Sequence, residues 1–245
     1  NRQYEYTPAG DIESIYDGLV NVTYTYTYDD LHRLSAEINN GGYKAMNVNY
    51  DSIGNIVSKT VGAKAFVINY NSYNQPHAVD YVTFNGNNYD YINDANGNMT
   101  QGWDFTNPAA VKKRAIAWNG DNMPSSINYG DGMAVTELLY DGIGSRVRKK
   151  TVSGGTTTYT YYFGEHYEIR GGVEYKYIFA GNLRVAQIAG GTVSYFHKDH
   201  LGSSTVMTDS SGHEIEYTNY EPFGGIRAHA GGTTSNYKFT DQELD

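Results

Sequence analysis

The stretch YFHKDHLGSSTVMTDSSGHEIEYTNYEPFG, residues 195–224, decides the fold. It begins as a strand, turns between Asp199 and Gly202, and continues as a second short strand. A second turn at Gly212 leads into a third strand that stops at Pro222. Asp, Ser and Gly mark turns, whereas the β-branched and aromatic residues between them favour strands. The stretch therefore predicts a compact β-meander.

A related five-residue turn unit recurs seven times upstream. It carries an aromatic residue at its first position in six copies, Asp or Asn at its second position in six copies, and Gly, Asn or His at its fifth. The first positions are Tyr6, Tyr28, Tyr50, Tyr70, Asn93, Trp118 and Tyr140. Successive copies are 22, 22, 20, 23, 25 and 22 residues apart, which is the length of one hairpin of two short strands. The array predicts an all-β fold of stacked antiparallel hairpins.

Each position of the unit has a physical reason. The Asp or Asn side chain accepts backbone N–H groups of the turn, and the fifth residue adopts a left-handed backbone. The fifth residues are Gly10, His32, Gly54, Asn74, Gly97, Asn122 and Gly144. Two residues later a strand restarts, at Ile12, Leu34, Ile56, Pro76, Met99, Pro124 and Arg146. Both prolines are expected at strand starts or edges.

Strict alternation marks the strands themselves. Val22, Tyr24, Tyr26 and Tyr28 fall on one face, with threonines between them. The same period appears in residues 46–50, 159–163 and 173–179, where the tyrosines are expected to be core and ladder residues. Hairpin tips are expected at residues 39–42, 85–88, 153–156, 171–172 and 190–191. Residues 107–117 fit a helix or a strand that ends at Trp118 equally well.

Composition excludes several classes of function. The 25 Tyr and 28 Gly against 5 Pro suit sheet broken by turns. A net charge of −9 argues against nucleic-acid partners and anionic membrane surfaces, and no segment is apolar enough for a membrane span. With no cysteine, disulfides and thiolate metal sites are excluded. No linker divides residues 1–245, so a single continuous structure is expected, cut from a longer chain.

The motifs resemble the Rhs/YD-repeat family. The turn unit is similar to the YD repeat over residues 1–162, and residues 163–245 resemble the Rhs core-associated segment. The most specific matches are DHLGS at residues 199–203 and YEPFG at residues 220–224. The closing residues 237–245 are similar to the family's next block, with Asp241 where Gly is usual.

The resemblance implies a β-sheet that spirals into a hollow shell, as in polymorphic toxins, insecticidal toxin complexes and, distantly, teneurins. It also implies a secreted or cell-surface bacterial protein whose shell encloses a C-terminal toxin or other cargo. Neither a toxin domain nor the family's aspartate-based self-cleavage motif, DPxGL, lies within residues 1–245. Autoproteolysis is therefore not carried over to this chain.

Three groups of polar residues could be taken for sites. His197, Asp199 and His200 offer metal ligands, but alternate strand side chains point to opposite faces, so Asp199 is expected to hold the turn and His200 to pack with satisfied ring nitrogens. Ser203 and Ser204 lie near His200 and Asp209 in sequence, without the turn that a nucleophilic serine needs. Glu214 and Glu216 are expected on the solvent face.

The sequence thus predicts a non-enzymatic structural module without metal or cofactor. Its partners would be the rest of its shell or neighbouring copies through sheet edges, and an enclosed cargo polypeptide. The alternatives are a glycan-binding adhesive surface and a self-assembling β-filament, while an enzyme would need polar residues that converge in one pocket. The motif residues, expected to be structural, are Tyr28, Asp29, Tyr50, Asp51, Gly54, Gly97, Tyr140, Asp141, Gly144, Asp199, His200, Leu201, Gly202, Ser203, Asp209, Gly212, Tyr220, Pro222, Phe223 and Gly224.

Overall fold

The structure, a computed structural model, describes residues 2–70, 75–107, 109–130 and 134–244. The chain divides into two compact units, Asn1–Trp103 and Asp104–Asp245. The regular elements in the described residues are strands, apart from one short 3-10 helix, η1 (Phe239–Asp241). The predicted all-β fold of antiparallel hairpins is confirmed, whereas a single continuous structure over the whole chain stays a prediction. No helix of the length and apolarity that a bilayer span demands occurs in the described part.

Unit 1 contains a nine-stranded antiparallel sheet in which β1 to β9 pair in chain order, followed by the antiparallel pair β10 and β11. Its strands are β1 (Arg2–Tyr6), β2 (Ile12–Asp17), β3 (Val22–Tyr28), β4 (Leu34–Asn39), β5 (Met46–Tyr50), β6 (Ile56–Val61), β7 (Lys64–Tyr70), β8 (Val79–Phe84), β9 (Asn87–Asp90), β10 (Ile92–Asn93) and β11 (Met99–Asp104), which ends at the unit boundary.

Unit 2 is one antiparallel sheet in which β12 to β23 also pair in chain order. Its strands are β12 (Lys112–Trp118), β13 (Pro124–Tyr129), β14 (Ala134–Tyr140), β15 (Arg146–Ser153), β16 (Thr156–Phe163), β17 (Tyr167–Arg170), β18 (Val173–Ala180), β19 (Leu183–Ala189), β20 (Thr192–Lys198), β21 (Ser204–Thr208), β22 (Glu214–Tyr220) and β23 (Ile226–Gly231). The meander predicted for residues 195–224 is confirmed as β20 to β22. The helix reading of residues 107–117 is wrong, because β12 ends at Trp118.

Strands restart where the turn unit predicts. Six of the seven predicted residues open a strand, at Ile12, Leu34, Ile56, Met99, Pro124 and Arg146. Pro76 is the exception, since it lies in a turn and β8 begins only at Val79. Proline has no N–H to give to a ladder, so it is accommodated in that turn or, as with Pro124, at the first position of a strand. The predicted Gly-Gly tips are confirmed between β15 and β16, β17 and β18, and β19 and β20.

The core of unit 1 lies under alternating strand residues. Met46, Val48 and Val61 are almost fully buried, with Leu34, Tyr50 and Ile56 packed against them. Met46 and Val48 are two residues apart on β5, so the period of two places both side chains on one face. Burial of such side chains stabilises the fold by about 1.5–3 kcal/mol each.

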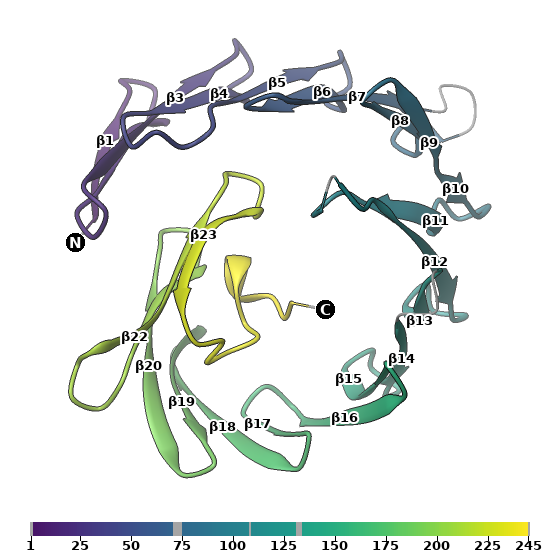
Figure 1. Ribbon diagram of the computed structural model, residues 1–245, viewed down its shortest axis with the longest axis vertical. Helices are drawn as coiled ribbons and strands as arrows, with labels where there is room; N and C mark the ends of the chain where they lie inside the picture. The colour runs from purple at the N-terminus through teal and green to yellow at the C-terminus, as the bar shows by residue number, and fades with distance from the viewer. Residues whose placement is uncertain (1, 71–74, 108, 131–133, 245) are drawn as a thin grey trace. The chain divides into compact units, whose positions relative to one another are not determined.

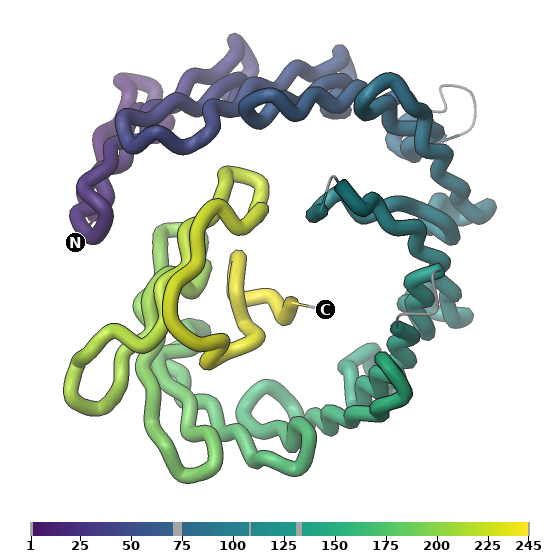
Figure 2. Tube along the Cα trace, viewed as in Figure 1, coloured from purple at the N-terminus to yellow at the C-terminus, as the bar shows by residue number. Residues whose placement is uncertain are grey.

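Unit 2 curls, and the chain after β23 lies on the concave side of the sheet that β16 to β22 form (Figures 1 and 2). On β16 the aromatic residues point the other way: Tyr159, Tyr161 and Phe163 are 38%, 41% and 57% exposed, whereas Thr160 between them is buried. The expectation that these tyrosines form core is therefore wrong. The side chains of β16 do alternate between two faces, but the more buried face is the one that carries Thr160 and Tyr162.

Candidate functional site

The turn units share one backbone geometry. A left-handed backbone was predicted at the fifth position of each copy, and six of the seven have it: Gly10 (φ 94°), His32 (58°), Gly54 (94°), Gly97 (86°), Asn122 (57°) and Gly144 (85°). The seventh, Asn74, lies outside the described residues. Gly202, Gly212 and Gly224 in the C-terminal part also have positive φ, at 83°, 83° and 85°. A side chain at such a position is strained, which explains why Gly, Asn and His occupy it.

An Asp or Asn side chain closes seven of these nine turns. One carboxylate or amide oxygen accepts the backbone N–H groups two and four residues later, at 2.8–3.0 Å. The acceptors are Asp29, Asp51, Asp94, Asn119, Asp141, Asp199 and Asp209. The turns of Asp199 and Asp209 therefore belong to the same unit as the upstream copies.

Hydrogen bonds also lower the pKa of three of these aspartates, Asp29, Asp94 and Asp209. The side chain of Arg33 donates to Asp29 and lowers its pKa, and the backbone N–H of His213 does the same for Asp209. For Asp94 the main cause of the lowered pKa is the amide of Asn98. The turns of Asp29, Asp94 and Asp209 thus favour the charged, accepting form of these three carboxylates.

Tyrosine hydroxyls tie neighbouring strands together. The tyrosine that ends one strand donates to the carbonyl oxygen of the residue that opens the strand before it, at 2.8–3.0 Å. The pairs are Tyr28 with Ile12, Tyr50 with Leu34, Tyr70 with Ile56, Tyr140 with Pro124, and Tyr220 with Ser204. Asn93 replaces the tyrosine in one unit, and its amide donates to the carbonyl of Val79, which opens β8, at 3.1 Å.

These ties were missed from the sequence, although a constant separation of 16 residues in four of the five tyrosine pairs was there to be found. They extend to YEPFG, where Tyr220 bonds to Ser204 and Pro222 and Phe223 lie in the turn. Backbone bonds between Glu221 and Gly225 and between Gly224 and Glu221 repeat the pattern of the Asp turns. Residues 220–224 are therefore a further copy of the turn unit.

The histidines near DHLGS do not form a metal site. His197 bonds to the hydroxyl of Thr208 at 3.0 Å, and His200 is exposed in the turn, as is Leu201. His200 lies in the turn, and its side chain is exposed and not packed as expected, because Asp199 supplies the turn's hydrogen bonds and leaves the next two side chains outside. In the part of the chain that the structure describes, no group of three or more His, Asp or Glu side chains is placed to hold a metal ion.

Ser203 has a structural contact of its own. It is fully buried, and its hydroxyl oxygen accepts the backbone N–H of Thr240 at 3.2 Å. Asp209 accepts the N–H groups of Ser211 and His213 in its own turn. Because His200 is exposed, the structure does not assemble these residues into a nucleophile, base and acid.

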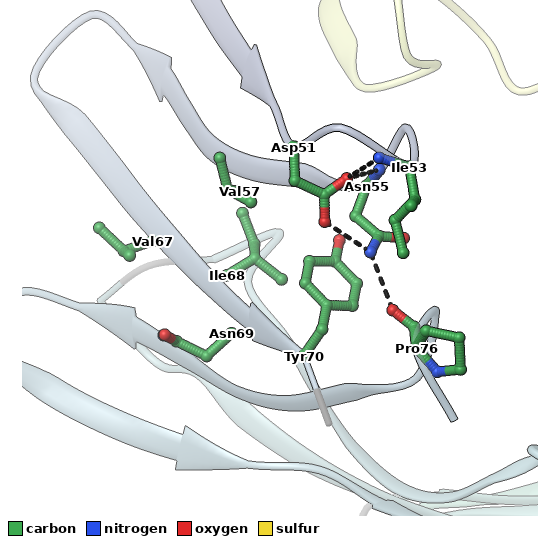
Figure 3. Close-up of a pocket in the computed structure, with 9 residues that line it drawn as sticks. All are labelled: Asp51, Ile53, Asn55, Val57, Val67, Ile68, Asn69, Tyr70 and Pro76. Atoms are coloured by element: carbon green, nitrogen blue, oxygen red, sulfur yellow. Dashed lines mark hydrogen bonds between the residues drawn. The ribbon is translucent and has the colours of Figure 1, made fainter. Parts of the chain in front are cut away.

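Unit 1 has a pocket of about 380 Å³ beside the turn from Asp51 to Asn55 (Figure 3). Its lining residues are Asp51, Ile53, Asn55, Val57, Val67, Ile68, Asn69, Tyr70 and Pro76. The Asn55 amide donates to the Asp51 carboxylate and to the Pro76 carbonyl, both at 2.8 Å, and Tyr70 is tied to Ile56. The polar groups of Asp51, Asn55 and Tyr70 are thus engaged in holding the turn, and the rest of the wall is largely aliphatic.

A group of buried ion pairs and hydrogen bonds lies where residues 233–244, here called the strap, contact the sheet of unit 2. Lys238 of the strap forms a buried ion pair with Glu216 of β22, and the other Glu216 oxygen accepts the backbone N–H of Thr234 at 2.8 Å. Glu216 is only 2% exposed, so its predicted place on the solvent face is wrong. Alternation identified its face, but the strap that covers this face comes from later in the chain.

Asp241 carries the second anchor of the strap. Its carboxylate lies 2.6 Å from the ammonium of Lys198 and 3.4 Å from the guanidinium of Arg184. Arg184 is 5% exposed and its guanidinium also lies over the rings of Tyr177 and Tyr237, at 4.2 and 3.5 Å. Asp241 itself has φ 58°, a backbone that glycine adopts without strain.

Glu243 carries the third anchor. It accepts from the Tyr162 hydroxyl at 2.7 Å, and it pairs with Arg146 at 3.1 Å and Lys149 at 3.2 Å. Burial, followed by the nearby Glu243 charge, raises the pKa of Tyr162 far above its usual value. Across the same face, Glu168 is buried and accepts the hydroxyls of Tyr177 and Tyr237 at 2.7 and 3.2 Å.

Gly224 is fixed by the strap as well as by its turn. A Cβ atom there would lie 2.7 Å from the ring of Phe239, besides requiring a φ of 85°. The ring of Phe239 also packs against that of Tyr220, with ring centroids 5.6 Å apart. Residues Tyr220 and Gly224 of the YEPFG motif thus form part of the strap's seat, a role that the sequence did not predict.

No protein-family model and no curated protein matches the chain. Among solved structures it is similar to the crystal structure of TcdB2-TccC3-Cdc42, with a TM-score of 0.48 and 15% identity, over 99% of this chain and 17% of that chain. It is also similar to the Tc holotoxin pore of Photorhabdus luminescens, with a TM-score of 0.48 and 16% identity, over 99% of this chain and 16% of that chain. The chain thus spans 16–17% of the length of these chains.

Proposed function

We propose that this chain is a non-catalytic wall module of an Rhs/YD-repeat shell, which encloses a polypeptide cargo in a secreted or cell-surface bacterial protein. One observation carries the proposal. The sheet of unit 2 curls around a segment of polypeptide, the strap, and holds it on the concave face through ion pairs with Glu216, Lys198 and Arg146. A surface that holds one polypeptide segment in this way is suited to face an enclosed chain.

The proposed mechanism is exclusion. In the described residues, neighbouring strands pair in chain order, so the backbone groups inside each ladder are hydrogen-bonded. A wall of this kind separates a peptide on its concave side from proteases and membranes on the other side. The outermost strands would be covered by the rest of the shell or by neighbouring copies, because an unpaired strand edge favours pairing with another chain.

Protease protection tests the enclosure. The natural polypeptide that carries residues 1–245 is purified intact and treated with proteinase K, alone and after opening in urea. We expect a cargo segment to resist digestion until the urea treatment. Digestion of every segment outside the sheets at the same rate in both samples would contradict the proposal.

Sedimentation tests the proposed edge pairing separately. If the edges of this chain pair with further copies, sedimentation coefficients of residues 1–245 will rise with protein concentration. A single monomer peak over a hundredfold range of concentration would exclude pairing with neighbouring copies, and it would also exclude a filament.

A second candidate, glycan binding, is favoured by the exposed aromatic side chains on β16. The rings of Tyr159 and Tyr161 are stacked, with centroids 5.9 Å apart and planes 11° apart, and Phe163 continues the row. Flat exposed rings suit sugar faces, and tyrosine hydroxyls tolerate water. A glycan array probed with the wild-type chain and with Tyr159→Ala/Tyr161→Ala tests it, with exposed Tyr195→Ala as the matched control. Equal glycan-binding signals from all three proteins would exclude the exposed face of β16 as a glycan-binding site.

A further inference from the structure

The strap is a self-contained element. Its own backbone closes it, because the N–H of Lys238 donates to Gln242, and the N–H of Leu244 donates to Asn236, both at 2.9 Å. Between the strap and the sheet, the described residues show one backbone-to-backbone hydrogen bond, in which the N–H of Ser204 donates to the carbonyl oxygen of Lys238 at 3.0 Å. The strap therefore docks through side chains and does not extend the ladder.

The strap is attached through a glycine pair that can act as a hinge. Gly231 has φ 82°, and a Cβ atom there would lie 2.3 Å from the carbonyl oxygen of Ile215. At Gly232, next to it, an added Cβ atom would meet no other atom within 4 Å. Glycines have the widest range of backbone conformations, so these two residues permit the strap to leave the sheet without strain in the chain that carries it.

Recognition between strap and sheet depends on complementary charge. The sheet offers Arg146, Lys149, Arg184 and Lys198 to the two strap carboxylates, Asp241 and Glu243. It offers Glu216 to Lys238 of the strap. A cation buried without a partner destabilises the protein. The concave face is therefore expected to bind a peptide that carries two carboxylates and a lysine in the same spacing as the strap.

We propose that the strap and the concave face of unit 2 form a separable ligand and receptor, and that this receptor accepts the strap of a second copy of the chain. If two copies exchange their straps, each strap makes the same contacts with the other copy that it makes in the monomer, where it is docked on its own sheet. The exchange requires only that the hinge opens. The inference is independent of the proposed enclosure, since it concerns the strap and its seat whether or not a cargo is present.

A labelled peptide of residues 232–244 tests the receptor. It is titrated by fluorescence anisotropy into the wild-type chain and into Asp241→Asn/Glu243→Gln, whose own strap has lost both anchoring charges. We expect the double variant to bind the peptide about tenfold more tightly than the wild type, because its own strap competes less well. A peptide with the same two substitutions is the matched control and should bind more weakly to both proteins. Equal binding of both peptides to a folded double variant would overturn the proposal.

A hinge variant keeps the proposal testable if the double variant does not fold. Gly231→Ala leaves strap and receptor residues unchanged but clashes with the Ile215 carbonyl where the end of β23 pairs with β22. We expect the end of β23 to detach, with undocked straps, peptide binding and a larger dimer fraction in sedimentation. Gly232→Ala is the matched control, with the closed form retained. A folded Gly231→Ala chain that stays monomeric overturns exchange between copies. Unfolding of both Gly231→Ala and the double variant would show that the strap is an inseparable part of the sheet, and would overturn the proposal as well.

Discussion

The hydroxyl of Tyr50 donates a hydrogen bond to the carbonyl oxygen of Leu34 at 2.8 Å. The bond joins the end of β5 to the start of β4, and four other tyrosines make the same connection elsewhere in the chain. Burial is the main reason why the pKa of Tyr50 lies above its usual value. The tyrosine of the turn unit is therefore a tie between strands as well as a packing residue.

Removal of this hydroxyl should weaken unit 1. Tyr50→Phe leaves the Leu34 carbonyl without this donor, and we expect the free energy of unfolding to fall by about 1 kcal/mol. Urea denaturation followed by circular dichroism measures the change. Tyr161→Phe, which removes an exposed hydroxyl on β16, is the control and should have little effect. Equal losses in both variants would show that the tie contributes nothing of its own.

The same ties predict a loss of stability in alkali. The pKa values of Tyr28, Tyr50 and Tyr70 are raised in the folded chain, mainly by burial. Their contribution is complete below the pKa of an unfolded tyrosine, about 10, and is lost as the pH rises through the folded values. The urea midpoint should therefore fall as the pH rises above about 10. The midpoint should fall less steeply in a variant in which Tyr28, Tyr50 and Tyr70 are all replaced by Phe. If the midpoints of the variant and the wild type fell in parallel with pH, this explanation would be contradicted.

Backbone conformation alone should make Gly54 sensitive to substitution. Gly54 has φ 94° with no atom within 4 Å of an added Cβ, so Gly54→Ala introduces strain without a clash. We expect a loss of about 1 kcal/mol in the free energy of unfolding. Gly120 also has open space but no positive φ, so Gly120→Ala should be neutral or slightly stabilising. Thermal melts of the two variants distinguish the effect of backbone strain at a positive φ from the general effect of replacing a glycine by alanine.

Glu243, the third anchor of the strap, should contribute more to the free energy of unfolding than a surface ion pair does. Glu243→Gln removes the charge that faces Arg146, Lys149 and Tyr162, and we expect unit 2 to lose about 2 kcal/mol. Glu165→Gln is the control, because Glu165 is exposed and lies 3.8 Å from an exposed His166. Its effect should be near zero. Hydrogen exchange of residues 233–244 should rise in the first variant alone, and unchanged exchange there would argue against anchoring by Glu243.

Local chemistry made much of the fold predictable. Positive φ at the fifth turn position, Asp or Asn as the turn's acceptor, and the strand restart two residues later each depend on a few neighbouring residues, and the structure confirms them wherever it describes them, Pro76 excepted. The single continuous structure and the enclosing shell depend on how distant parts assemble, and they stay predictions.

The errors have a common cause. Glu216 was expected in solvent and the tyrosine rings of β16 in the core, because alternation assigns residues to two faces without saying which face another segment will cover. The strap, whose Thr234 bonds to Glu216 from 18 residues later in the chain, decides that question for β22.

The sequence by itself determined where the chain turns and where each strand begins, since those choices are made by backbone sterics and hydrogen bonds within five residues. Only the tertiary structure decided what the concave face of unit 2 holds. Four cations from β15, β19 and β20 meet Asp241 and Glu243 there because the curl of the sheet brings residues up to 97 positions apart into contact. Long-range pairing of buried charges depends on that curvature, which no local pattern in the sequence encodes.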